Sequence, residues 1–212
     1  RGIEELAKAL SDGLSHRTKV VWLLCGGTNV PIAISVMNKL RHDVPHSIFK
    51  NLTVGLIDER YGEAGHKDSN WQALSDAGFD FEATKTFPVL TGLSLSETVA
   101  KYAEIVKEQF ENARSIIGQF GVGADGHIAG ILPYSRAVDA TDLVFSYDAF
   151  PLRRITLTPM ALQKIHTAYT FVFGKEKMEA VRRLRDQKLS IEEQPAQILK
   201  KVAKSYLYSD QL

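Results

Sequence analysis

Short, continuous runs of apolar residues recur along the chain, separated by stretches in which apolar positions repeat every three or four residues. The first pattern is typical of buried strands and the second of amphipathic helices. Predicted strands cover 20–25, 52–57, 114–120, 154–158 and 169–173. This alternation indicates an α/β fold of three layers, Rossmann-like, in which helices flank a mostly parallel central sheet.

Helical periodicity is clearest over 95–110, where Ser94 and Glu97 have the spacing of a capping box. The apolar stripe of this helix is Leu95, Val99, Tyr102, Ala103, Val106 and Phe110. Two more helices are indicated by Ile3, Leu6, Ala7, Leu10 and Leu14, and by Met178, Val181 and Leu184. The segment 76–92 shows neither pattern, so we expect it to cross the surface.

The chain has 212 residues, which fits one domain over 1–212, and its 26 basic and 25 acidic residues leave a net charge of +1. This balance gives no overall reason to bind nucleic acid or an anionic membrane. No apolar run reaches the ~18 residues of a membrane span, and no signal peptide is visible. We expect a cytoplasmic monomer or small homo-oligomer with a small-molecule ligand. Because the sequence starts at Arg1, we expect the natural N-terminus to lie upstream.

The sequence predicts neither a metal nor an organic cofactor. A single cysteine, Cys25, excludes an internal disulfide and any multi-cysteine metal site. At the end of a predicted buried strand it is more typical of a core residue than of a nucleophile. His42 and His46 are separated by Pro45 and lack a second ligand pair, so no zinc site is expected there.

The segment 121–126 has the G-x-G-x-x-G spacing of a dinucleotide-binding loop. Such a loop must open a long helix whose N-terminus faces the pyrophosphate. Here Gly130 interrupts the segment and Pro133 follows seven residues after Gly126, so a long helix is not expected. Dinucleotide binding is therefore disfavoured.

The same segment carries Asp125 and His127 on either side of a glycine. A carboxylate beside an imidazole suits proton transfer, because an imidazole titrates near pH 6.5. The alternative is a histidine that makes only structural hydrogen bonds in a glycine-rich turn.

A second glycine segment, "CGGTNVP", follows the predicted strand 20–25. Gly26 and Gly27 let the backbone approach an anion closely, Thr28 or Asn29 can cap the next helix, and Pro31 is placed for a helix start. The N–H groups at such a helix start attract phosphate. A phosphate-binding loop and an ordinary strand-to-helix turn are both consistent with this segment.

Charged residues follow the predicted strand 52–57, at the tip where a solvated cleft would begin. Asp58 or Glu59 could orient a sugar hydroxyl, and Arg60 offers a planar fork suited to phosphate. The nearby Asp68, Ser69 and Asn70 are typical of a cap for a helix starting at Trp71, and His66 is as well explained by exposure as by function.

Further basic residues lie near predicted strand ends, namely Arg153, Arg154, Lys175 and Lys177. Each alone is typical of surface charge. Together with Arg60 and the loop 26–29 they would form a small cationic pocket in a nearly neutral protein. A sugar phosphate is the ligand that such a pocket suits.

In this order the segments resemble the family of glucosamine-6-phosphate isomerases and 6-phosphogluconolactonases. The matching motifs are GGTN at 26–29, DER at 58–60, DSN at 68–70, G-x-G-x-D-G-H at 121–127, RITLT at 154–158, G-x-x-K at 174–177 and QPAQIL at 194–199. The resemblance covers nearly the whole chain. It implies hydrolysis of 6-phospho-D-glucono-1,5-lactone to 6-phosphogluconate in the oxidative pentose phosphate pathway.

Within the family, the motifs favour the lactonases over the deaminases. Deaminases resemble this chain less at DER and DSN, and their histidine loop carries a glutamate at the position of Leu132. Lactonases usually read D-G-H-T-A-S-L-F-P, from which this chain departs at Ile128, Gly130, Ile131 and Leu132. Their phosphate loop usually reads G-G-S-T-P, whereas Pro31 here is displaced by one residue.

The resemblance implies a different role for each group of candidate residues. His127 would take a proton from water, Asp125 would orient the imidazole, and Asp58 would lie in the catalytic centre. The phosphate would bind the loop of Gly26, Gly27, Thr28 and Asn29 together with Arg60, Arg154 and Lys177. The alternatives are a glucosamine-6-phosphate deaminase with Asp58 as its base, and a sugar-phosphate sensor without catalysis.

Overall fold

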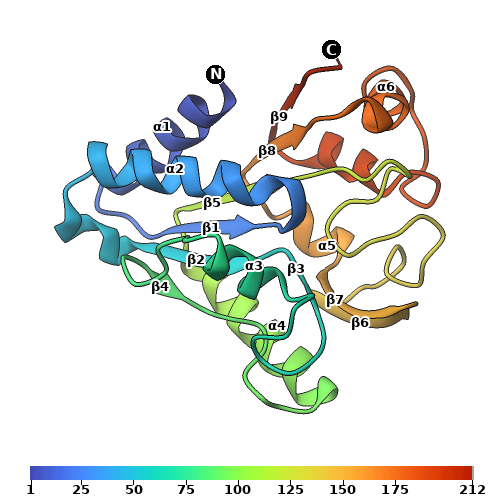
Figure 1. Cartoon of the computed structure of the whole chain (residues 1–212), viewed down its shortest axis with the longest axis horizontal. Coiled ribbons are helices and arrows are strands. Elements are labelled where there is room, and N and C mark those ends of the chain that lie inside the picture. The colour runs from blue at the N-terminus through green and yellow to red at the C-terminus, as the bar shows by residue number, and fades with distance from the viewer. Residues whose placement is uncertain (212) are drawn as a thin grey trace.

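The computed structural model describes residues 1–211 and has a central sheet of six parallel strands (Figure 1). Across the sheet the strands follow the order β4-β2-β1-β5-β8-β9. Their bounds are β1 Val20–Leu24, β2 Leu52–Leu56, β4 Lys85–Thr86, β5 Ser115–Phe120, β8 Thr167–Val172 and β9 Lys204–Ser209. The three-layer, Rossmann-like α/β fold predicted from the sequence is confirmed.

Helices cover both faces of this sheet. Helices α1 (Gly2–Ser15) and α2 (Val30–Asp43) lie on one face and α4 (Leu95–Asn112) on the other (Figure 1). The other helices are α3 Asn70–Asp76, α5 Pro159–Leu162, α6 Met178–Asp186 and the 3₁₀ turns η1 Gly27–Asn29, η2 His46–Asn51, η3 Lys175–Lys177 and η4 Pro195–Lys201. Strands β1 and β2 are buried along their whole length, which explains their uninterrupted apolar runs. None of the helices in residues 1–211 combines the length and apolar character that crossing a membrane requires.

A second, antiparallel sheet contains β3 (Asp58–Arg60), β7 (Leu152–Leu157) and β6 (Val144–Ala149), with β7 in the middle. The predicted strand 154–158 therefore belongs to this sheet and not to the parallel one. The charged residues 58–60, which follow the predicted strand 52–57, also lie in a strand and not at the tip of a loop. Pairing with β7 holds these three polar residues extended, a tertiary effect that local propensity does not reveal.

Two edge strands were not predicted. Strand β4 lies inside the irregular segment 76–92 and pairs with β2 over only two residues, while the nearby Phe87 and Val89 are buried. Strand β9 is partly exposed and pairs only with β8 within the described residues. Both lack the continuous apolar run that marks a central strand.

The chain reverses its direction of travel across the sheet at β1. It passes from β1 to β2 and β4 on one side, and then returns to place β5 on the other side of β1. The connections leaving β1 and β5 consequently diverge, which opens a crevice at the carboxyl ends of these strands. The glycine segments at 26–29 and 121–127 both begin there.

Glu59 ties β3 to the start of α3 from a fully buried position. Its carboxylate accepts hydrogen bonds from the backbone N–H groups of Arg60 (2.8 Å), Asn70 (2.6 Å) and Trp71 (3.0 Å) and from Ser69 Oγ (2.9 Å). Burial raises the pKa of Glu59, and these four donors oppose that shift. Glu59 was expected at a solvated tip, so its assignment as a residue that orients a sugar is wrong.

The caps of two helices agree with the sequence. Ser69 Oγ accepts from Gln72 N at the start of α3 (3.1 Å), and Ser94 and Glu97 form the capping box of α4. Since Ser69 also donates to Glu59, one buried carboxylate organises both the strand end and the helix start.

We predict that Glu59→Gln lowers the free energy of unfolding by about 3 kcal/mol, because an amide NH₂ would face backbone donors that need an acceptor. Urea denaturation measures the change. Glu111→Gln is the matched control: Glu111 is exposed on α4, and its substitution should change stability by no more than about 0.5 kcal/mol. Equal stability of both variants would contradict the anchoring role of Glu59.

Candidate active site

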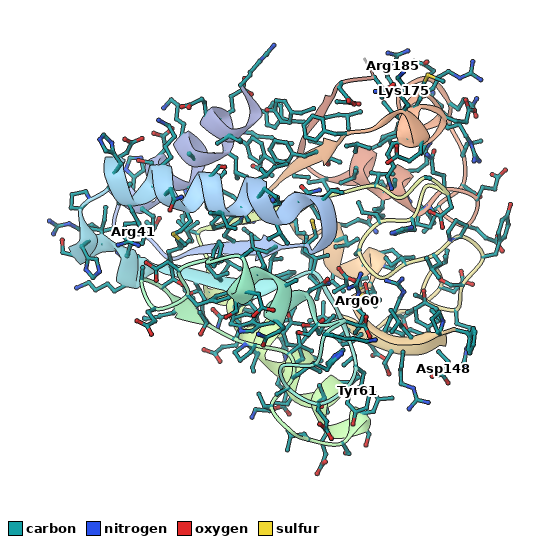
Figure 2. All side chains as sticks on the ribbon, in the orientation of Figure 1. Arg41, Arg60, Tyr61, Asp148, Lys175 and Arg185 are labelled. Carbon is teal, nitrogen blue, oxygen red and sulfur yellow. The ribbon has the colours of Figure 1, made fainter. Side chains whose placement is uncertain are left out.

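A cavity of about 230 Å³ lies at the carboxyl ends of β1 and β5. Nine of the ten residues predicted for the site line it, namely Gly26, Gly27, Thr28, Asn29, Asp58, Arg60, His127, Arg154 and Lys177. The tenth, Asp125, contacts His127 from outside the lining. Arg60, on β3, lies near the middle of the view, whereas Arg41, Lys175 and Arg185 lie at the periphery (Figure 2).

The first wall of the cavity is the turn between β1 and α2. Gly27 has a φ of +64°, a left-handed conformation that favours glycine, and the 3₁₀ turn η1 leads from it into α2. Neither Thr28 nor Asn29 caps α2 with its side chain, contrary to expectation. The amide of Asn29 instead donates to Phe171 O of β8 (3.1 Å), so the helix start keeps N–H groups that can donate hydrogen bonds to an anion.

The second wall carries two arginines that lie directly opposite each other on neighbouring strands of the antiparallel sheet. Arg60 on β3 pairs in register with Arg154 on β7. Like charges directly opposite in a sheet repel each other. The Nε atoms of both arginines are buried and have no hydrogen-bond partner within residues 1–211. Both arginines also line the cavity, so they bring positive charge to it.

Each arginine is held by one further contact. Arg60 Nη1 donates to Asp68 O (2.9 Å), and Arg154 Nη1 lies 3.9 Å from Asp58 Oδ2. Asp58 also lines the cavity and is only 6% exposed, so its carboxylate is nearly buried. Arg60, Arg154 and Lys177 against the single carboxylate of Asp58 leave the lining with a net charge of +2.

The other two basic residues predicted near strand ends lie away from the cavity. Arg153 lies inside β7 rather than at its end, and it pairs with Asp148. Lys175 is exposed in η3, as Figure 2 shows for its labelled side chain. Strand alternation explains the first case, because neighbouring residues point to opposite faces of a sheet.

The third wall is the tight turn that holds His127. Gly126 N donates to Gly123 O (2.9 Å), and Gly123 N donates to His127 O (3.0 Å). A Cβ atom on Gly123 would overlap His127 Nδ1, so only glycine permits this approach. Gly123 and Gly126, the second and third glycines of the apparent dinucleotide motif, therefore serve a histidine turn.

Asp125 fixes the imidazole of His127. Its Oδ1 lies 2.7 Å from His127 Nδ1 and also accepts from His127 N (3.0 Å). The hydrogen bond from the His127 side chain lowers the pKa of Asp125 to about 2, so Asp125 is the acceptor and Nδ1 carries the proton. The other ring nitrogen, Nε2, is left to accept a proton on the cavity side.

Two segments that are distant in sequence hold the histidine turn through hydrogen bonds to its backbone. Thr156 Oγ1 on β7 accepts from Gly130 N (3.0 Å), and Tyr147 OH on β6 donates to Gly130 O (2.7 Å). Ala196 N, in the QPAQIL segment, donates to Gly126 O (3.1 Å). Residue 130 departs from the usual lactonase pattern, and its glycine lies where a Cβ atom would crowd Thr156.

Sequence reasoning missed six lining residues, namely Cys25, Asn70, Gly121, Val122, Gly123 and Ala129. Asn70 was expected only to cap a helix. Its Nδ2 donates to Asp58 O (2.9 Å), and its buried Oδ1 has no partner in the described chain. The DSN motif was the available signal, but nothing in it shows which way the amide points.

Cys25 is not placed for nucleophilic attack. It is buried, and its burial together with the charge of Asp58 raises the pKa of its thiol. Within residues 1–211 no three His, Cys, Asp or Glu side chains are grouped so that they could hold a metal ion.

Comparisons with known proteins agree with this architecture. The profile of the family described as glucosamine-6-phosphate isomerases/6-phosphogluconolactonase matches residues 1–208. A 6-phosphogluconolactonase of Borreliella burgdorferi is 29% identical over 193 residues, covering 84% of this chain and 77% of the relative. One of Helicobacter pylori is 26% identical over 180 residues, covering 82% and 76%.

This chain shares its fold with solved structures of lactonases and of a deaminase. The crystal structure of a 6-phosphogluconolactonase from Thermotoga maritima superimposes with a TM-score of 0.76 at 20% identity, covering 98% of this chain and 94% of that one. A monomeric glucosamine-6-phosphate deaminase superimposes with a TM-score of 0.79 at 19% identity, covering 99% and 93%. The match of the family profile to almost the entire chain is decisive: this protein belongs to the glucosamine-6-phosphate isomerase/6-phosphogluconolactonase family.

Proposed function

We propose that this protein is a 6-phosphogluconolactonase, which hydrolyses 6-phospho-D-glucono-1,5-lactone to 6-phosphogluconate. The observation that carries the proposal is one cavity lined by two chemically different sets of residues, which we place at its two ends. One set has two arginines opposite each other, a lysine and a helix start; the other has an imidazole whose Nδ1 is held by a carboxylate. The relatives at 26–29% identity carry the same activity in their names.

The cationic end suits the phosphate of the substrate. A phosphate dianion would compensate the lining charge of +2 and accept from the donors of Arg60, Arg154 and Lys177 and from the N–H groups of the loop 26–29. The phosphate is remote from the reacting carbon, so this binding energy orients the lactone carbonyl toward His127.

His127 is suited to act as the general base. Nε2 takes a proton from water, whose oxygen then attacks C1 of the lactone and forms a tetrahedral intermediate. When the intermediate collapses, the bond between C1 and the ring oxygen breaks and the imidazolium returns the proton to that oxygen. The resulting carboxylic acid releases its proton to solvent.

Asp125 and Asp58 have different parts in this mechanism. Asp125 keeps the proton on Nδ1, so that Nε2 is basic, and stabilises the imidazolium when it forms. Asp58, buried beside Arg154 and held near Asn70, would accept a hydrogen bond from a hydroxyl of the sugar ring. These roles need neither a metal nor an organic cofactor.

Deaminase chemistry is less well supported by the sequence of the histidine loop. The glutamate that assists the catalytic histidine in deaminases would fall on Leu132, which cannot exchange protons. Release of ammonia from glucosamine 6-phosphate provides the direct assay. Turnover at a rate comparable to lactone hydrolysis would overturn this part of the proposal.

We predict that His127→Ala lowers kcat/KM for the phosphorylated lactone by about 10²- to 10⁴-fold, because general base catalysis is lost. Acid release from freshly generated lactone, with the uncatalysed rate subtracted, measures this change. The affinity for 6-phosphogluconate should stay within about twofold, since the cationic end is untouched. Full activity in His127→Ala would refute the mechanism, and His42→Ala, which changes an exposed histidine, serves as the control.

We predict that the carboxyl group of Asp125 titrates with a pKa of about 2 and that His127→Ala shifts this pKa upward. The pKa is lower in the folded protein than the ordinary value of about 3.9, so the contribution of Asp125 to stability is present above that value and disappears as the pH falls toward 2. Carbon NMR of the carboxyl groups gives both pKa values. An unchanged pKa in the variant would show that the imidazole does not stabilise the carboxylate.

We predict that Arg60→Ala raises KM for the phosphorylated lactone by about 10- to 100-fold, the effect of one lost charge-assisted hydrogen bond. Hydrolysis of unphosphorylated glucono-1,5-lactone should change by less than about twofold, because that substrate lacks the group that Arg60 binds. The matched control is Arg153→Ala: Arg153 is next to Arg154 on β7, but it pairs with Asp148 and does not line the cavity. Equal losses on both lactones would argue against a phosphate-specific role.

A further inference from the structure

The imidazole of His66 uses both of its nitrogen atoms in the loop between β3 and α3. His66 Nε2 lies 2.8 Å from Arg60 O, and His66 Nδ1 lies 3.3 Å from Asp68 N. A carbonyl oxygen can only accept and a backbone N–H can only donate, so Nε2 carries the proton and Nδ1 does not. The contacts therefore specify a neutral imidazole in a single tautomer.

These contacts close a ring around Arg60. The backbone oxygen of Arg60 accepts from His66, the backbone N–H of Asp68 donates to His66, and Asp68 O accepts from Arg60 Nη1 (2.9 Å). The imidazole thus links the backbone of Arg60 to the backbone of Asp68, whose carbonyl oxygen holds the guanidinium group. His66 itself does not line the cavity.

From this geometry we infer that His66 is a positioning residue, which holds Arg60 in the orientation that binds the phosphate of the substrate. This inference rests on the proposed function, in which Arg60 binds phosphate. A guanidinium group gains most from a phosphate when its planar fork is aligned with two oxygens, so a small rotation of the loop weakens the contact. His66 supplies alignment and not a direct contact.

The role of His66 is separable from the folding of the same region. Glu59 anchors the base of the loop and the start of α3 through Ser69, Asn70 and Trp71, and none of these contacts involves the imidazole. His66 is half-buried, whereas Glu59 is fully buried. Loss of the imidazole should therefore release Arg60 without unfolding α3.

The test is a double-mutant cycle of His66→Ala and Arg60→Ala, read on the phosphorylated and the unphosphorylated lactone and by calorimetric binding of 6-phosphogluconate. His66→Ala should raise KM and Kd for the phosphorylated compounds by about tenfold, keep kcat within about twofold, and leave the unphosphorylated lactone unaffected. In the Arg60→Ala background it should have no further effect, because its action passes through Arg60.

Two more variants separate positioning from general destabilisation. His66→Gln can donate an amide hydrogen to Arg60 O, so it should recover part of the lost affinity. His42→Ala removes an exposed histidine from the last turn of α2, about 18 Å along the helix from the loop 26–29, and should change nothing.

Different results overturn different statements. Additive losses in the double variant, or equal losses on both lactones, would refute the role of His66. An effect of Arg60→Ala without an effect of His66→Ala would do the same and leave the proposed function intact. If the wild type bound 6-phosphogluconate without hydrolysing the lactone, the proposed function would fail, and the binding measurements alone would decide the role of His66.

Discussion

The reversal of the chain at β1 is the constraint on which the rest of the molecule depends. Because β2 and β5 lie on opposite sides of β1, the connections leaving β1 and β5 diverge. The crevice between them brings together a helix start at Gly27 and a histidine turn at Gly123. Two segments almost a hundred residues apart therefore share one cavity, and Gln119 Nε2 at the end of β5 donates to Asn29 O (2.9 Å) beside it.

The small antiparallel sheet turns this crevice into a site with a defined charge. Strands β3 and β7 place Arg60 opposite Arg154, and β6 and β7 hold the histidine turn through Tyr147 and Thr156. Two arginines directly opposite each other on neighbouring strands repel when no anion compensates their charge. The buried hydrogen bonds of Glu59 keep β3 in place in spite of this repulsion. Stability at Glu59 thus permits charge repulsion at the neighbouring Arg60.

The division between fold and site explains what the sequence could predict. Central strands and amphipathic helices follow from periodicity, so β1, β2, β5, β8 and the helices α1, α4 and α6 were found. The residues of the cavity follow chemically specific motifs, and nine of the ten predicted residues lie in its lining. The antiparallel sheet was missed because β3 is short and polar and is held by its partner strand. Glu59, buried beneath four donors, was mistaken for an exposed charge for the same reason.

The orientation of a bound ligand is the most direct test of the central claim that one end of the cavity binds phosphate and the other performs proton transfer. A crystal structure of the wild-type protein with 6-phosphogluconate provides it. The account predicts the phosphate between Arg60 and Arg154 against the loop 26–29, and the C1 carboxylate on the side of the cavity that His127 lines. A phosphate beside His127, or a ligand bound outside this cavity, would contradict the account.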